Sequence, residues 1–74
     1  MERYFMSRTS AVALLVGTRQ TLAAELHEQP PQETQHNHRM LQELERLLLS
    51  VRVGRIREFD LEFPNRIHVI VSDN

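Results

Sequence analysis

Apolar residues recur at helical spacing along residues 37–51, and this is the clearest pattern in the chain. At an advance of about 100° per residue, six of them fall within one stripe about 120° wide, as a core-facing helix requires. They are Met40, Leu41, Leu44, Leu47, Leu48 and Val51. Leu49 points away from this stripe, so we expect it to be exposed. The pattern predicts a helix over residues 37–51, capped by Thr34 or Asn37.

A second helical pattern covers residues 8–28. Its core-facing positions recur at spacings of three and four residues: Ala11, Leu14, Leu15, Thr18, Leu22 and Leu26. Gly17 costs a helix about 1 kcal/mol relative to alanine, so a buried strand over residues 11–16 is an alternative. Pro30 and Pro31 end the helix because proline has no amide hydrogen to donate. The short polar connection that follows favours antiparallel helices.

After Ser50 the apolar period changes from 3.6 residues to 2. Phe59, Leu61 and Phe63 alternate with acidic residues, and Ile67, Val69 and Val71 alternate in a second segment. Pro64 and Asn65 between them suit a tight turn, so we predict a β-hairpin with strands over residues 56–63 and 66–72. Ile70 makes the second strand apolar on both faces. We therefore expect that strand in the middle of a sheet, completed by residues 4–6 or by a second subunit.

These patterns predict a single α+β domain over residues 1–74. An antiparallel two-helix hairpin is followed by a C-terminal β-hairpin, and a short N-terminal strand over residues 4–6 is an option. A chain of 74 residues buries only about 60% of its unfolded surface, so its stability is marginal. Cysteine is absent, which excludes disulfides and thiolate sites. We therefore expect partner binding or a symmetric homodimer to supplement the core.

Charge and hydropathy exclude some classes of partner. The formal net charge is -1 and all nine basic residues are arginine, so no overall field attracts nucleic acid or anionic lipid. The longest apolar run, from Ala11 to Gly17, is far shorter than the roughly 20 residues of a membrane-spanning helix. No signal-peptidase pattern follows that run. The expected location is the cytoplasm.

Four histidines raise the question of a metal site. His36 and His38 are two residues apart, which places them on different sides of a helix, although in a loop or strand both could reach one ion. We expect them to be solvated linker histidines. His27 lies where a helix dipole favours a cation, and His68 is expected beside an acidic cross-strand residue. The sequence contains no phosphate-binding loop, nucleophile elbow or H-E-x-x-H motif. We predict no metal, no cofactor and no catalytic residue.

The remaining hypothesis is a small protein-binding regulator or inhibitor, of the kind that bacteria, phages and plasmids encode as short reading frames. Interfaces depend on a few apolar anchors with a polar rim, and arginine is enriched in them. The predicted helix over residues 37–51 and the last strand offer such anchors. The candidate partner-binding residues are Arg46, Leu49, Arg52 and Ile70.

The alternative hypothesis is nucleic-acid binding through arginines around the predicted β-hairpin. Arg52, Arg55, Arg57 and Arg66 are available for contacts to phosphates, whereas the acidic residues along the same strand would repel them. The order of a short strand and two helices is similar to that of ribbon-helix-helix repressors. The Gly-x-Ser/Thr turn between the helices of those repressors is replaced here by two prolines, so we assign no membership.

Overall fold

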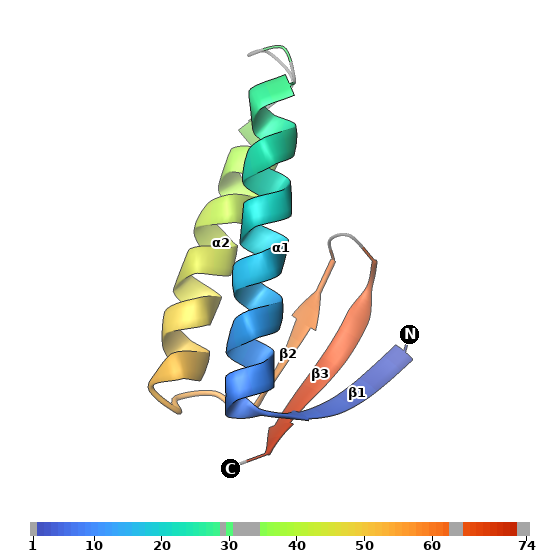
Figure 1. The fold of residues 1–74 in the computed structure, drawn as a ribbon, viewed down its shortest axis with the longest axis vertical. Helices are drawn as coiled ribbons and strands as arrows, with labels where there is room; N and C mark the ends of the chain where they lie inside the picture. Colours follow the sequence, from blue (N-terminus) through green and yellow to red (C-terminus); the bar gives the residue numbers. More distant parts are fainter. Residues whose placement is uncertain (1, 29, 31–34, 63–64, 73–74) are drawn as a thin grey trace.

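The computed structural model describes residues 2–28, 30, 35–62 and 65–72. Its elements in chain order are β1 (Glu2–Ser7), α1 (Arg8–Glu28), α2 (Gln35–Arg52), β2 (Glu58–Leu61) and β3 (Ile67–Ser72). The strands form one sheet in the order β1-β3-β2. Helices α1 and α2 run antiparallel, and α1 packs on β1 and β3 (Figure 1). The predicted α+β architecture, including the optional N-terminal strand, is confirmed.

Helix α1 has the bounds that the sequence predicted, so the alternative of a strand over residues 11–16 is wrong. Ser7 precedes the helix, and its Oγ accepts a hydrogen bond from the backbone N–H of Ser10 at 3.1 Å, as an N-cap residue does. The helix buries Ala11, Leu15, Thr18 and Leu22. The Thr18 hydroxyl donates to the Leu14 carbonyl at 2.8 Å, which satisfies its buried oxygen.

Helix α2 begins at Gln35, two residues before Asn37. Asn37 therefore lies in the first turn and is not the N-cap, and Thr34 lies outside the described residues. Leu44 and Val51 are buried, and the other four apolar residues of the predicted stripe are partly buried against the core. The predicted core-facing stripe is confirmed, and Leu49 is exposed as expected.

Helix α2 ends in a Schellman motif. The N–H of Gly54 donates to the Val51 carbonyl at 3.1 Å, and the N–H of Arg55 donates to the Ser50 carbonyl at 2.8 Å. Gly54 has a φ of 79°, a conformation that side chains other than glycine rarely adopt. This motif turns the chain sharply, and residues 55–57 then carry it to the sheet.

Strand β3 is the middle of the sheet, as predicted, and the third strand comes from the N-terminus of the same chain. It pairs in parallel with β1 and antiparallel with β2, so Val69 lies between Tyr4 and Phe59. Strand β2 is shorter than the predicted range 56–63 at both ends. Residues 56 and 57 belong to the connection from α2, Glu62 follows the strand, and Phe63 lies outside the described residues. The predicted turn at Pro64 and Asn65 falls partly outside the described residues.

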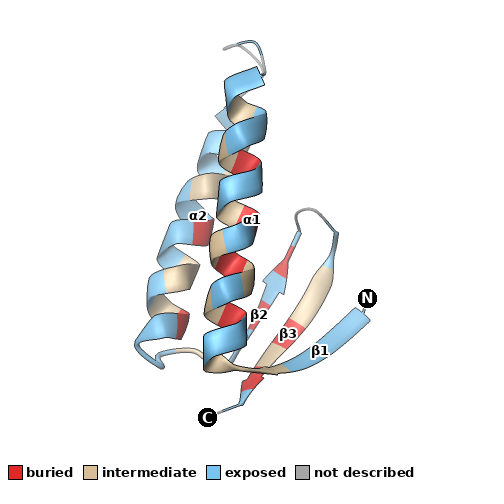
Figure 2. Ribbon diagram, viewed as in Figure 1, coloured by how far each residue is buried: buried red, intermediate tan, exposed pale blue. Residues whose placement is uncertain are grey.

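The core lies between the sheet and the helical hairpin. Phe59, Leu61, Val69 and Val71 are buried on the sheet side, together with the buried residues of both helices. Figure 2 shows buried positions where α1 faces α2 and the sheet, whereas most of β1 is exposed. The sheet is thus covered by helices on one face only (Figure 1).

The two glycines are expected to respond oppositely to alanine. Gly17 is exposed, and no heavy atom lies within 4 Å of an added Cβ. Gly17→Ala should raise the free energy of unfolding by about 1 kcal/mol and the melting temperature by about 4–8 °C. Gly54→Ala should lower both, because of the φ of 79° and the Arg8 guanidinium 3.2 Å from the added Cβ. Thermal unfolding followed by circular dichroism measures the effect, and a lower melting temperature for Gly17→Ala would contradict the exposed position.

Candidate interaction surfaces

An apolar pair is exposed at the C-terminal end of α2. The side chains of Leu49 and Val53 are 61% and 68% exposed. They are four residues apart and therefore lie on the same side of the helix, with Arg46 one turn before Leu49. Leu49, Ser50, Val53 and Arg55 line a shallow open hollow. We call Arg46, Leu49, Arg52, Val53 and Arg55 the α2 patch.

The backbone fixes the position of this patch. The N–H of Val53 donates to the Leu49 carbonyl at 3.1 Å, and the Schellman bonds at Val51 and Ser50 follow directly. Val53 is therefore held against the last turn of the helix, although it lies one residue beyond the end of α2. An interface on a fixed backbone pays less conformational entropy on binding than one on a free loop.

Ile70, the fourth candidate partner-binding residue, lies on a different surface from Leu49. In β3 it alternates with the buried Val69 and Val71, so its side chain points to the sheet face that the helices leave uncovered. It stands in register with Phe5 and Glu58. The structure brings Arg46, Leu49 and Arg52 together, and it separates Ile70 from them.

The uncovered sheet face has an apolar half and a polar half. Phe5, 78% exposed, lies beside Ile70. On the β2 side, the His68 ring nitrogen Nδ1 lies 2.5 Å from Asp60 Oδ1, and His68 Nε2 lies 3.7 Å from Glu58 Oε2. The predicted acidic neighbour of His68 is therefore confirmed. Sequence reasoning missed Phe5, although its alternation with Tyr4 and Met6 was a signal that it belongs to the opposite face.

Tyr4 lies on the helix-facing side of β1 and is 42% exposed. Its phenol donates a hydrogen bond to the Glu2 carboxylate. This hydrogen bond and the nearby negative charge raise the pKa of Tyr4 above its usual range. Tyr4 also borders an open hollow, which is lined by Tyr4, Met6, Leu14, Leu61, Asn65 and Ile67.

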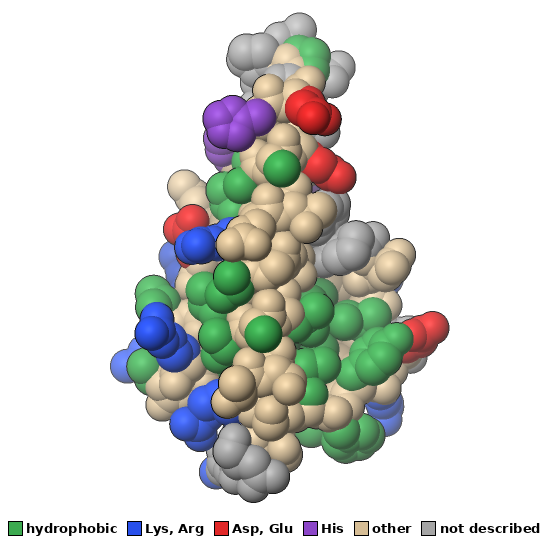
Figure 3. All heavy atoms as spheres, viewed as in Figure 1, with side chains coloured by type: hydrophobic (Ala, Val, Ile, Leu, Met, Phe, Trp, Pro, Cys, Tyr) green, Lys and Arg blue, Asp and Glu red, His purple; other side chains and the backbone are tan. Residues whose placement is uncertain are grey.

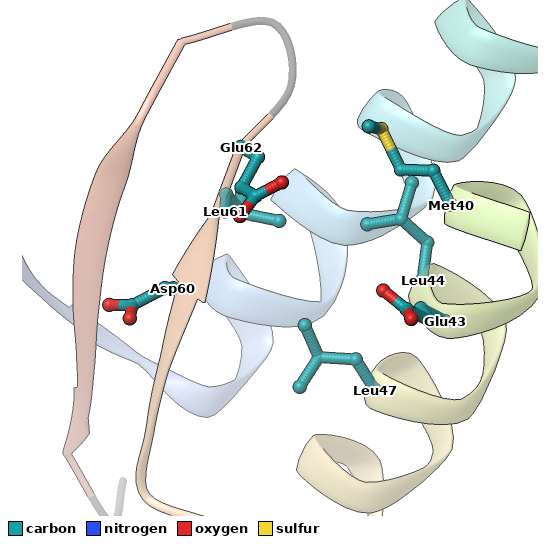
Figure 4. A pocket seen from close by; sticks show the side chains of 7 residues that line it. All are labelled: Met40, Glu43, Leu44, Leu47, Asp60, Leu61 and Glu62. Carbon is teal, nitrogen blue, oxygen red and sulfur yellow. The ribbon is translucent and has the colours of Figure 1, made fainter. Parts of the chain in front are cut away.

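A narrow groove separates α2 from β2. Figure 4 shows Met40, Leu44 and Leu47 on α2 facing Leu61, whereas Asp60 points away from the helix. Carboxylates of Glu43 and Glu62 also line it, but its volume of about 140 Å³ is well below the roughly 300–1,000 Å³ of common ligand pockets.

The structure places the other histidines at the far end of the helical hairpin. His27 lies in the last turn of α1, the position expected from the sequence. His36 and His38 are exposed but belong to α2, so their assignment to a linker is wrong. Within the described ranges, no three His, Cys, Asp or Glu side chains are grouped so that they could hold a metal ion.

The arginines proposed for nucleic acid do not form one group. Arg52, Arg55 and Arg57 are exposed around the end of α2 and the connection to β2. Arg66 precedes Ile67, which pairs with Leu61 at the other end of β2. Arg8, which sequence reasoning missed, comes close to Gly54 at the C-terminal end of α2. Figure 3 shows basic side chains gathered around this lower end of the helices.

Val53 was also missed in the sequence analysis, although its spacing of four residues from Leu49 was the available signal.

Neither of the two helices in the described part of the chain is long and apolar enough to cross a membrane.

Comparison with known proteins identifies the family to which this chain belongs. A family model described as "Uncharacterized protein BTH_I2711-like" matches residues 2–73, and the chain therefore belongs to this BTH_I2711-like family. No curated protein and no solved structure matches the chain. The description of the family names no activity or ligand, so membership assigns no function to any of these surfaces.

Proposed function

We propose that this member of the BTH_I2711-like family is a non-enzymatic protein-binding regulator or inhibitor that acts in the cytoplasm. The single observation that carries the proposal is the α2 patch, in which two large apolar side chains stand exposed one helical turn apart. Arginines surround them, so the patch combines apolar anchors with the residue type that interfaces favour.

The charge of the patch indicates the chemistry of the partner. Arg46, Arg52 and Arg55 are exposed around Leu49 and Val53. A partner that presents apolar side chains flanked by carboxylates would bury the anchors and place its acidic groups against the guanidinium rim. Such complementarity mainly raises the association rate and selects the partner, whereas the apolar anchors supply most of the affinity.

The proposal is tested by quantitative affinity purification from the native host with matched variants. Leu49→Glu and Val53→Glu place a negative charge in the patch, and Gln20→Glu places one on an exposed position of α1. We expect one protein to be captured by the parent and by Gln20→Glu, and to be depleted at least about tenfold with both patch variants. Titration calorimetry with the purified partner then measures the loss of affinity.

If every captured protein is retained equally by Leu49→Glu and Gln20→Glu, the α2 patch is not the binding surface. The side chains of Leu49 and Val53 are largely exposed, so neither substitution should unfold the protein. As a folding control, the circular dichroism spectrum of each variant must match that of the parent.

A second candidate function is favoured by the exposed Arg52, Arg55 and Arg57 at one end of the molecule. These side chains can contact phosphates, and such binding weakens steeply as salt rises. A gel-shift assay at two salt concentrations, with the parent and with Arg52→Gln/Arg55→Gln, separates this candidate from a protein-binding role. A shift that is lost in the double variant and in high salt would favour nucleic acid.

A further inference from the structure

Strand β1 forms a long and regular edge of the sheet. It pairs with β3 over its whole length, Glu2–Ser7, and no strand in the described part of the chain pairs with its other side. Natural edge strands are commonly short, or carry charged residues, proline or a bulge. Strand β1 has six residues, no proline and an unbroken register with β3, and its two charged residues, Glu2 and Arg3, are of opposite sign and lie at its N-terminal end.

The opposite edge of the sheet is built differently. Strand β2 has only four residues, and Glu58 and Asp60 are two of them. Both point to the uncovered face, where they interact with His68. Shortness and charge discourage strand addition. Half of the residues of β2 are acidic, whereas β1 is longer and its two charges are of opposite sign, so the two edges are unequal and β1 is the one suited to a further strand.

Exposed aromatic side chains flank the β1 edge on both faces. Phe5 lies on the uncovered face beside Ile70, and Tyr4 lies on the helix-facing side. Tyr4 also borders the open apolar hollow that reaches Leu14 and Ile67. Figure 3 shows hydrophobic side chains gathered beside α1 in this region. An added strand at β1 would cover apolar surface above and below the sheet, in addition to pairing the edge.

The occupant that complements this edge is a second β1 strand. Two copies related by a two-fold axis perpendicular to the sheet bring like faces together, so residues of the same face must oppose each other. With Tyr4 opposite Tyr4 of the second copy, Arg3 lies opposite Phe5 and Glu2 lies opposite Met6. No like charges meet, and a guanidinium group over an aromatic ring is favourable.

The neighbouring registers fit less well. A register centred on Arg3 places two guanidinium groups opposite each other, which is destabilising. A register centred on Phe5 pairs Arg3 with Ser7. The hydroxyl of Ser7 caps α1 through Ser10, and the chain becomes helical at Arg8, so the strand is already ending there. The Tyr4-centred register uses residues that lie wholly within β1.

We propose that two copies of the chain join their β1 strands antiparallel about Tyr4, forming a continuous six-stranded sheet with both helical hairpins on the same face. This pairing supplements a small core that no disulfide supports. It involves a different surface from the α2 patch, so it does not depend on the proposed protein-binding role.

Single cysteines test the pairing directly, because the chain contains none. Directly opposed residues of antiparallel strands have Cα atoms about 4.5–5.5 Å apart, within the range of a disulfide. Under mild oxidation, Tyr4→Cys should give mostly disulfide-linked dimer, whereas Val53→Cys, at a more exposed position, should give little. Cross-linking of Tyr4→Cys no faster than that of Val53→Cys would overturn the proposal. Faster cross-linking of Phe5→Cys than of Tyr4→Cys would overturn the register.

Sedimentation equilibrium over a hundredfold concentration range provides an independent measurement. The parent should show a concentration-dependent mass that approaches a dimer. Phe5→Lys places a cation opposite Arg3 of the second copy and should raise the dimer dissociation constant by about tenfold or more. Leu49→Lys, which adds the same charge to the α2 patch, should leave it within about twofold. A parent that stays monomeric, or equal weakening by the two substitutions, would overturn the proposal.

Discussion

Replacing Leu15 by alanine is expected to lower the free energy of unfolding by about 2–5 kcal/mol. Leu15 is fully buried in α1, the helix that contacts both α2 and the sheet. The substitution therefore leaves a cavity in the core that solvent cannot fill. Domains of this length have a total stability of about 4–11 kcal/mol at the usual 0.05–0.15 kcal/mol per residue. The substitution therefore removes a large part of the total, and urea unfolding should show a much lower midpoint.

Leu49→Ala is the matched control for this prediction. The same atoms are removed from a side chain that is 61% exposed, so the free energy of unfolding should change by no more than about 0.5 kcal/mol. If Leu15→Ala and Leu49→Ala unfold at similar urea concentrations, α1 does not pack as described.

The second large effect is expected from Val69→Lys. Val69 is fully buried in the middle strand, between Tyr4 and Phe59. A lysine held there must be neutral, and removing its proton at pH 7 costs about 5 kcal/mol from a reference pKa of about 10.4. We expect the variant to be unfolded at neutral pH by circular dichroism and by one-dimensional proton spectra.

The pH dependence of this variant has a defined sign. The folded state depresses the pKa of the lysine, so the unfolded state binds more protons and stability rises with pH. Val69→Lys should therefore recover structure as the pH approaches 10.

The control for Val69→Lys is Ile70→Lys, one residue further along β3. Its side chain points to the uncovered face and lies opposite Glu58, so the charge stays hydrated and has an acidic neighbour. This variant should remain folded at pH 7. An unfolded Ile70→Lys together with a folded Val69→Lys would reverse the two faces of the sheet.

The interaction surfaces were only partly predictable. Arg46, Leu49 and Arg52 are three residues apart, so their neighbouring positions along the helix follow from spacing alone. Exposure depends on which elements cover a residue, and for Phe5 and Val53 this was not apparent. The spacing signals at these two residues give the face of the element on which each side chain lies, but not whether another element covers that face.

The sequence by itself determined the elements that depend on local spacing. The stripes of α1 and α2 and the alternation along β2 and β3 each concern residues two to four positions apart, so they specify the element and its apolar face. The bounds of α1 were predicted to the residue, and those of α2 within two. The structure adds the caps at Ser7 and Gly54, whose hydrogen bonds also join nearby residues.

Only the tertiary structure decided how these elements combine. Strand β1 pairs in parallel with β3, which comes from the other end of the chain, and no local period carries that information. The sequence left open whether residues 4–6 or a second subunit complete the sheet beside β3. The pairing with β1 decides this, and it leaves β1 at the edge with Phe5 exposed. It also separates Leu49 from Ile70, because the helices cover one face of the sheet and Ile70 lies on the other. Such contacts arise from the packing of distant segments, and the apolar faces alone do not specify which segments meet.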